Sequence, residues 1–340
     1  MRGFFTWRAF GTADGWEAAP ASAADGAPVT QYTGPVAEAA APFVQAVPSW
    51  CAHTPPGSWI ELQVRARMDA RWTNFYRVAR WDAAPENSAR TSLEGQRDAE
   101  GRVATDTLVL NTPAAALQVR VLLHAGAGGA PTLERIAVAL SAPGEIATSD
   151  LALPTLELAV PPRAQLDYAD GPNICSPTSV SMVLAYWQAR TGDAALAPFA
   201  ERRAVEAIVT PQVYDPAYDG HGNWAFNTAF AAAQGLDAAV RRSGGLAELV
   251  PWLAAGVPII NSVAWQPGTL DNAPIPRSAG HLLVVAGFTT GGRVLVADPR
   301  GDTEAEVRRE YDAAQLEYAW QSVSQGTAYV IHPRGWPVPE

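Results

Sequence analysis

The first part of the chain alternates hydrophobic and polar positions with a period of two. In residues 59–69, WIELQVRARMD, one set is hydrophobic and the other polar. The hydrophobic set is Ile60, Leu62, Val64, Ala66 and Met68, and the polar set is Glu61, Gln63, Arg65, Arg67 and Asp69. Residues 117–125, LQVRVLLHA, repeat the pattern. Successive side chains of a strand point to opposite faces, so this period predicts half-buried strands.

Further strand patterns occupy residues 72–81, 106–111 and 133–141, and no long helical pattern intervenes. Many short strands with polar outer faces are typical of an antiparallel sandwich. We therefore predict a jelly-roll-like antiparallel β-sandwich over residues 1–145. Residues 146–164 contain several prolines and little periodicity, which predicts a linker.

From residue 165 to the C-terminus, helical and strand patterns are mixed. The helical patterns cover 177–190, 224–234, 246–256 and 311–320, and the apolar strand patterns cover 257–265, 281–288, 293–299 and 327–332. Gly235 and Gly256 follow two of the helical patterns, as is common at helix ends. The pattern predicts an α+β domain over residues 165–340.

Charge and composition exclude several classes of function. The 340 residues carry a formal net charge of −10 and include two cysteines. A chain this acidic, without a basic run, is a poor partner for nucleic acid or anionic membranes. No zinc-type cysteine spacing, phosphate loop or dinucleotide fingerprint is visible, so we expect no metal and no cofactor. No signal peptide or membrane-spanning stretch is visible, so we expect no membrane insertion.

A cysteine opens the most hydrophobic helix pattern. In NICSPTSVSMVLAYW, residues 173–187, Cys175 precedes Pro177, a residue favoured in the first turn of a helix. The following positions are apolar nearly all round, which predicts a buried helix. The unpaired N–H groups and dipole at a helix start favour a thiolate, which is the nucleophilic form. A small buried hydrophobe is the alternative for Cys175.

A base and an orienting group follow along the chain. His281 opens the strand pattern HLLVVAGF, and Asp298 ends the next one, RVLVADP. Adjacent strands can place these side chains together, which is the arrangement a cysteine nucleophile requires. Taken singly, His281 could be a structural strand-end residue and Asp298 a turn former.

These motifs, in this order, resemble the papain-like cysteine peptidases, in the C39-like group related to the bacteriocin-leader peptidases. The matching segments are PPRAQLDYADGPNICSPTSVSMVLAYW, NWAFNTAFAAAQGL, LVPWLAAGVPIINSV, GHLLVVAGF and VLVADPRG. The resemblance covers roughly residues 155–333 and implies a papain-like fold. It also implies that Cys175 is the nucleophile, His281 the general base and acid, and Asp298 the group that orients the histidine.

The resemblance further implies that Gln165 donates to the oxyanion with the Cys175 N–H. Gln165 lies ten residues before the cysteine, farther than the family usually shows, so Asn173 is an alternative donor. His221, Asn223 and Trp224 lie in a glycine-flanked loop, YDGHGNW, that could line a substrate cleft. Structural roles are the alternative for these three residues.

The sequence thus predicts an enzyme that cleaves a peptide or amide through an acyl-enzyme. An acyltransferase or amidase with the same triad is one alternative, because a triad does not specify the acceptor. A glycan- or surface-binding protein with an inactive peptidase-like scaffold is another, with aromatic side chains as candidate ligand platforms. These side chains are Trp50, Trp59, Trp72 and Trp81. The compartment is left open, with the cytoplasm favoured slightly over secretion.

Overall fold

A computed structural model describes residues 2–22, 28–84, 89–142 and 153–339. The chain folds into two compact units. The first consists of residues 1–143 and 214–229, and the second of residues 144–213 and 230–340. The boundaries expected from sequence place residues 214–229 in the C-terminal domain, whereas the structure groups them with the first unit.

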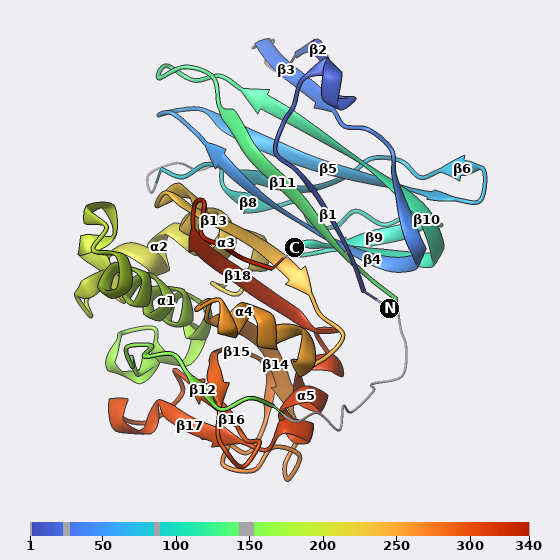
Figure 1. Cartoon of the computed structure of the whole chain (residues 1–340). Coiled ribbons are helices and arrows are strands. Elements are labelled where there is room, and N and C mark those ends of the chain that lie inside the picture. The colour runs from blue at the N-terminus through green and yellow to red at the C-terminus, as the bar shows by residue number, and fades with distance from the viewer. Residues whose placement is uncertain (1, 23–27, 85–88, 143–152, 340) are drawn as a thin grey trace. The chain divides into compact units, whose positions relative to one another are not determined.

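The first unit is an antiparallel β structure (Figure 1). Its eleven described strands hydrogen-bond into one sheet, whose main path has the order β1-β11-β4-β10-β5-β7-β8. The strands are β1 (Arg2–Trp7), β2 (Glu17–Ser22), β3 (Pro28–Thr33), β4 (Ala37–His53), β5 (Trp59–Met68), β6 (Arg71–Trp72), β7 (Tyr76–Trp81), β8 (Thr91–Ser92), β9 (Gly101–Ala104), β10 (Thr107–His124) and β11 (Thr132–Ser141). The expected antiparallel β architecture is confirmed, whereas the jelly-roll connectivity stays a prediction.

Two long strands connect the parts of this sheet. Strand β4 pairs with β10 through residues 37–46 and with β11 through residues 45–53. Strand β10 pairs with β9 near its start and with β5 and β3 toward its end. The β4–β10 register shifts on either side of Ala114. Such bulges bend a strand and increase its twist, so one strand can serve two parts of a sheet.

The alternation read from β5 and β10 is confirmed on its hydrophobic side. All five predicted inward residues of β5 are at most 7% exposed. In β10, the inward residues Leu117, Val119, Val121 and Leu123 are also buried. On the polar side of β5 the structure differs from a simple solvent face, because Glu61 and Gln63 are 4% and 5% exposed. Neighbouring side chains cover them.

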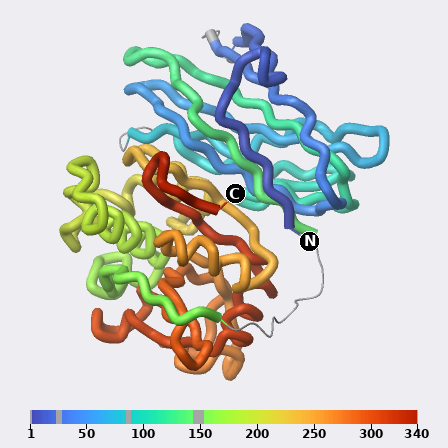
Figure 2. Tube along the Cα trace, in the orientation of Figure 1, coloured from blue at the N-terminus to red at the C-terminus, as the bar shows by residue number. Residues whose placement is uncertain are grey.

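The second unit combines helices with a seven-stranded antiparallel sheet, of order β13-β18-β14-β15-β16-β17 with β12 paired to β15 (Figures 1 and 2). Its strands are β12 (Leu156–Glu157), β13 (Leu236–Arg242), β14 (Ile259–Trp265), β15 (Ser278–Phe288), β16 (Val294–Ala297), β17 (Arg308–Tyr311) and β18 (Thr327–Pro333). The helices are α1 (Cys175–Thr191), α2 (Thr210–Val213), α3 (Trp224–Ala233), whose first residues belong to the first unit, α4 (Val250–Ala254) and α5 (Ala313–Gln321). The mixture of helices and strands is as predicted.

Three details of the second unit differ from the sequence prediction. Leu156–Glu157, expected in the linker, forms β12 and pairs with Phe288 and Gly287. Strands β13 and β17 were not anticipated. The last helix begins at Ala313 rather than at Tyr311, because the Asp312 side chain accepts a hydrogen bond from Gln315 N and caps it.

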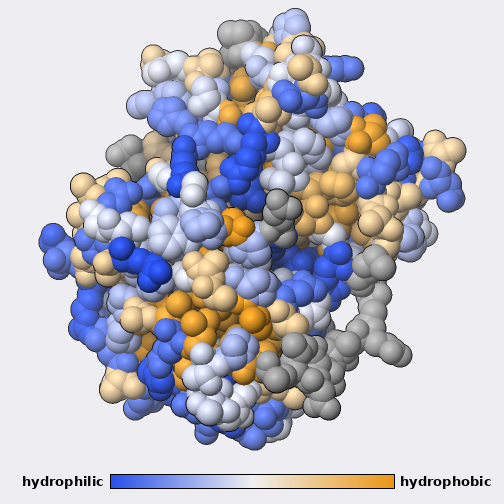
Figure 3. Space-filling view, in the orientation of Figure 1, coloured by the Kyte–Doolittle hydropathy of each residue, from blue (hydrophilic) through white to orange (hydrophobic). Residues whose placement is uncertain are grey.

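Hydrophilic residues are spread over the face of the molecule shown in Figure 3, and hydrophobic residues gather in one area of the second unit. Among the described residues, the exposed large hydrophobic side chains are Val36, Tyr218, Tyr318 and Val323. In the described part of the chain, no helix combines the length and apolar character needed to cross a membrane.

Candidate active site

Helix α1 places Cys175 at its first position. Residues 176–187 are all buried, and the helix ends at Gly192, which adopts the left-handed conformation with φ of 69°. Ser179 Oγ donates to Leu282 O at 3.1 Å and so fixes α1 against β15. The helix has no side-chain cap at its N-terminus, where free N–H groups favour negative charge. Cys175 is partly exposed, whereas the other free cysteine, Cys51, is buried.

Strand β15 supplies a histidine and the turn after β16 supplies an acid. His281 is 4% exposed and Asp298 is fully buried. His281 Nε2 lies 2.7 Å from Asp298 Oδ1. The Trp265 ring meets the imidazole edge to face, with centroids 5.6 Å apart. With Nε2 directed at the carboxylate, Nδ1 is the nitrogen that remains for Cys175, with which His281 forms a side-chain hydrogen bond.

The carboxylate of Asp298 is held by two further donors. Arg300 N donates to Oδ1 at 2.9 Å, and the Tyr311 hydroxyl donates to Oδ2 at 2.6 Å. The backbone is fixed as well, because Asp298 N donates to Val307 O at 2.7 Å. A buried carboxylate with this many donors is stable as an anion and has little freedom to turn.

Electrostatics favour an ion pair between the cysteine and the histidine. Burial alone would raise the pKa of Cys175, but the hydrogen bond and charge of His281 and the Leu282 N–H outweigh it, so that this pKa is lowered from 9.0. Burial would lower the pKa of His281, but Asp298 and Cys175 raise it to about 10. The pKa of Asp298 is lowered against its burial, mainly by His281 and then by Tyr311 and Arg300. Thiolate, imidazolium and carboxylate therefore stabilise one another.

Gln165 lies beside this chain of groups despite its distance in sequence. The backbone N–H of Gln165 donates to the carbonyl oxygen of Pro299 at 2.7 Å, and Pro299 is the residue next to Asp298. Two short 3₁₀ turns, Gln165–Asp167 and Gly171–Asn173, fold the intervening segment back on itself. A Cβ at Gly171 would lie 2.9 Å from Gln165 O, so this close approach requires glycine. The ten-residue spacing is thus taken up by a compact double turn.

The amide of Gln165 is buried and oriented. It is 1% exposed, its Nε2 donates to Gly171 O, and its Oε1 has no partner among the described atoms. Asn173 is exposed, its backbone N–H donates to Asp170 O at 2.9 Å, and its side chain has no hydrogen-bond partner among the described residues.

Residues 157–328 match the model of the Peptidase_C39 like family, which is half of the chain. The chain belongs to this family. Residues 11–141 match a second model, the peptidase C39 N-terminal domain. The resemblance found in the sequence is confirmed, and membership suggests activity of the cysteine peptidase type.

More distant comparisons add little to the C39-like assignment. A solved structure described as a candidate C39-like peptidase from Bacillus anthracis is 18% identical and has a TM-score of 0.36. The match covers 53% of this chain and 98% of that one, and this level of similarity supports no further conclusion. No curated protein matches the chain.

The three residues predicted to bind substrate belong to the first unit of this C39-like chain, not to the unit that contains Cys175. Asn223 Nδ2 donates to Asp215 Oδ2 at 2.8 Å, and its Oδ1 accepts from Phe226 N at the start of α3. Trp224 N donates to Asp106 Oδ2 at 2.6 Å. His221 is 9% exposed, and its carbonyl accepts from the Asn227 amide. These contacts are structural, and a role in substrate binding stays a prediction.

The tryptophans considered for ligand stacking divide into two kinds. Trp50 and Trp81 are 1% exposed and pack against each other and against Phe226. Trp59 is stacked on His124, with ring centroids 3.4 Å apart, and Trp72 lies beneath the Arg65 guanidinium. Trp50 and Trp81 are therefore core residues, and the rings of the other two are already in contact with side chains.

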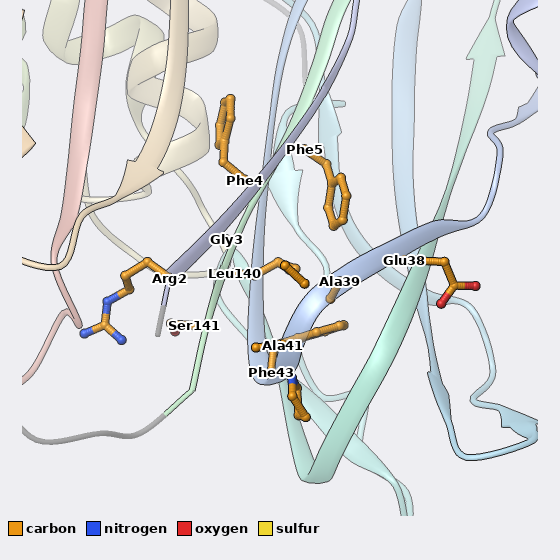
Figure 4. A pocket seen from close by; sticks show the side chains of 12 residues that line it. Arg2, Gly3, Phe4, Phe5, Glu38, Ala39, Ala41, Phe43, Leu140 and Ser141 are labelled. Carbon is orange, nitrogen blue, oxygen red and sulfur yellow. The ribbon is translucent and has the colours of Figure 1, made fainter. Parts of the chain in front are cut away.

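A small pocket is lined by residues of the first unit alone, and Cys175, His281 and Asp298 are not among them (Figure 4). Its volume is about 150 Å³, and its lining comes from β1, β4 and β11. Phe4, Phe5 and Leu140 are among the apolar lining residues, while Arg2 and Glu38 lie at opposite sides of the view. The lining contains no cysteine or histidine. In the described ranges no group of three His, Cys, Asp or Glu side chains could hold a metal ion.

Sequence reasoning missed Tyr311, because the residue was expected to begin a helix. The structure places it at the end of β17, which pairs with β16 just before Asp298. In the sequence RREYD, nothing marks the tyrosine as a partner of a distant carboxylate. Only the pairing of these two strands brings its hydroxyl to the carboxylate.

We expect Tyr311→Phe to lower kcat/KM for amide hydrolysis roughly 10- to 100-fold, because a lost charge-assisted hydrogen bond costs about 1.5–3 kcal/mol. Asp298 would then hold the imidazole less firmly and stabilise its charge less. The control is Tyr186→Phe, which removes a buried hydroxyl bonded to Gly256 O at 2.9 Å in the same unit. Equal losses in both variants would mean that Tyr311 supports only folding. A shift of the alkaline limb of the pH profile to lower pH in Tyr311→Phe alone would mark a positioning role, because this limb reports the proton of His281.

Proposed function

We propose that the second unit is a papain-like cysteine peptidase that cleaves amide bonds through a covalent acyl-enzyme. The supporting observation is the hydrogen-bonded series from Cys175 through His281 to Asp298, on three separate elements of one unit. A nucleophile, a base and an orienting group in hydrogen-bond contact are the minimum for this chemistry.

The proposed reaction has two stages. The Cys175 thiolate attacks the substrate carbonyl carbon, and a C–S bond forms. As the C–N bond breaks, the His281 imidazolium gives its proton to the leaving amine. A water molecule, deprotonated by the now neutral His281, then attacks the thioester, releasing the acid and restoring the ion pair. Asp298 keeps the imidazole in the required tautomer and stabilises its charge throughout.

Gln165 is the favoured side-chain donor for the oxyanion. An amide nitrogen carries two N–H groups, so Nε2 can keep its bond to Gly171 O and donate a second one. Its buried position and its anchor beside Asp298 keep the amide in place without reorganisation. Asn173, exposed to solvent, offers no such preorganisation.

Replacement of the two candidate donors separates them. We expect Gln165→Ala to lower kcat roughly 10²- to 10³-fold, the usual cost of losing one oxyanion donor. Asn173→Ala, the matched control, should change kcat less than about twofold. Steady-state kinetics on a cleaved peptide, with thermal melting to monitor folding, measures both. The opposite ranking would transfer the oxyanion role to Asn173.

A mixture of internally quenched peptides tests the function itself. Wild-type protein is expected to release fluorescence and the Cys175→Ala variant to release none. Adding a primary amine and analysing products by mass spectrometry separates hydrolysis from acyl transfer. All 24 basic residues of the chain are arginines, so no lysine side chain competes as acceptor. Formation mainly of the amide adduct would make the protein an acyltransferase, and no turnover with either acceptor would contradict the proposal.

A further inference from the structure

The polar face of β5 and β10 carries two arginines that are bound only to neutral partners. Arg65 lies opposite Gln118, and Gln63 lies opposite Arg120. Arg65 donates through Nε and Nη2 to Gln118 Oε1, at 2.9 and 2.5 Å. Arg120 donates in the same way to Gln63 Oε1, at 2.8 and 2.5 Å. Each guanidinium therefore uses two donors on an amide oxygen, and neither forms a hydrogen bond or ion pair with a carboxylate of the described residues.

One aromatic ring holds both guanidinium groups. Their central carbons lie 4.6 Å (Arg65) and 3.9 Å (Arg120) from the Phe75 centroid, and Arg65 also lies 4.6 Å from the Trp72 centroid. Cation–π contacts of this kind fix the planes of the two groups. The pKa of Arg120 is lowered by burial and then by repulsion from Arg65, with Glu61 opposing. Two like charges are thus held close together.

The carboxylate of Glu61, whose charge acts on Arg120, is already occupied. Glu61 is bound by Arg77 at 2.8 and 2.7 Å and by Arg80 at 3.2 Å, and it also accepts from Gln63 at 2.6 Å. We call Arg65, Arg77, Arg80 and Arg120, with Glu61, the arginine face. In this described network Arg77 and Arg80 share the carboxylate of Glu61, and Arg65 and Arg120 bind only amide oxygens, although the whole chain has a net charge of −10.

A neighbouring arginine, Arg67, forms an ion pair with a carboxylate, as arginines commonly do. Arg67 lies two residues along β5 from Arg65, and its Nη2 pairs with Glu38 at 2.7 Å. Arg67 also lies over the Trp72 ring, at 5.8 Å. The chain can therefore neutralise an arginine on β5, whereas among the described residues neither Arg65 nor Arg120 has a carboxylate partner.

We propose that Arg65 and Arg120 form a binding site for an oxyanionic group, a carboxylate or a phosphate, carried by a ligand of this β unit. Arginine has five N–H donors in a planar fork that suits both groups. Among the described residues, Nη1 of Arg65 and Nη1 of Arg120 have no hydrogen-bond partner. Both side chains are partly exposed, and an anion between them would remove their mutual repulsion. The site is independent of the proposed thiol chemistry.

Calorimetry on the full chain at low salt tests the site with three probes: oligogalacturonate for carboxylates, tripolyphosphate for phosphates, and maltohexaose as an uncharged control. Wild-type protein should bind at least one anionic probe, more weakly as salt rises, and should not bind maltohexaose. Arg65→Gln and Arg120→Gln should each weaken binding at least roughly tenfold. Preference for one anionic probe identifies the group that the site takes.

Arg67→Gln is the matched control, because it removes the same charge from the same strand at a paired position. We expect it to change affinity less than about threefold. If Arg120→Gln fails to fold, Arg120→Lys keeps the charge without the fork and should bind more weakly than wild type. No binding of either anion by folded wild-type protein would overturn the proposal. Equal weakening by Arg67→Gln, or equal binding of maltohexaose, would also overturn it.

Discussion

At about pH 6, a limiting amount of iodoacetamide is expected to label Cys175 at least roughly tenfold faster than the same residue in the His281→Ala variant. An ordinary thiol with a pKa of ~8.5 is only roughly 0.3% thiolate at that pH. His281 lowers the pKa of Cys175 through a hydrogen bond and a charge, so the variant loses both. The labelling rate of Cys175 rises by less than its thiolate fraction does, because a thiolate of lower pKa is a weaker nucleophile. Peptide mapping by mass spectrometry measures the rates.

Cys51 provides an internal control in the same sample. It is 3% exposed, so it should remain unlabelled while the protein is folded and react after denaturation. Equal labelling rates of Cys175 in wild type and His281→Ala would show that the histidine does not activate the thiol. The pair would then be structural, and the proposed peptidase mechanism would fail.

The ionisations of Cys175 and His281 predict different pH profiles for alkylation and for hydrolysis. Alkylation requires only the thiolate, so its rate should rise once, through the lowered pKa of Cys175. Hydrolysis also requires the proton of His281, whose pKa is raised to about 10. Hydrolysis should therefore fall again as the pH passes about 10, when the imidazolium loses its proton.

The second large effect is expected from Asp298→Ala, which should lower kcat/KM for peptide hydrolysis roughly 10²- to 10⁴-fold. The substitution removes the acceptor of His281 Nε2 and leaves Tyr311 without its partner. The imidazole can then rotate or adopt the wrong tautomer, and its charged form loses a buried carboxylate at 2.7 Å. The pKa of His281 should fall, which moves the alkaline limb of the hydrolysis profile to lower pH.

Asp298→Asn separates orientation from charge. An asparagine oxygen can still accept from His281 Nε2, while its amide nitrogen can donate to the Tyr311 oxygen. We expect an activity between those of wild type and Asp298→Ala, with the alkaline limb lowered as in the alanine variant. An Asp298→Ala protein that folds and retains most of its activity would exclude Asp298 from the mechanism.

Local pattern was sufficient for most of the elements, though not for β12, β13 and β17, and for the order of the candidate site residues. The period of two in β5 and β10 gave the buried faces correctly, because alternation follows directly from strand geometry. The apolar run after Cys175 gave α1, since a helix apolar on all sides has to be buried. His281 and Asp298 were found because one opens an apolar strand pattern and the other ends the next, and the structure places His281 Nε2 2.7 Å from Asp298 Oδ1.

Contacts between distant segments were decided only by the tertiary structure. The double turn that brings Gln165 to Pro299, the β16–β17 pairing that brings Tyr311 to Asp298, and the inclusion of residues 214–229 in the first unit all depend on close approach between residues far apart in sequence. The arginine face is a further case, because Glu61 and Gln63 look solvent-exposed by alternation but are covered by side chains from β7 and β10. Periodicity reports which side of an element is apolar. It carries no information about which polar partners the fold will place there, because those pairings depend on packing across the whole unit.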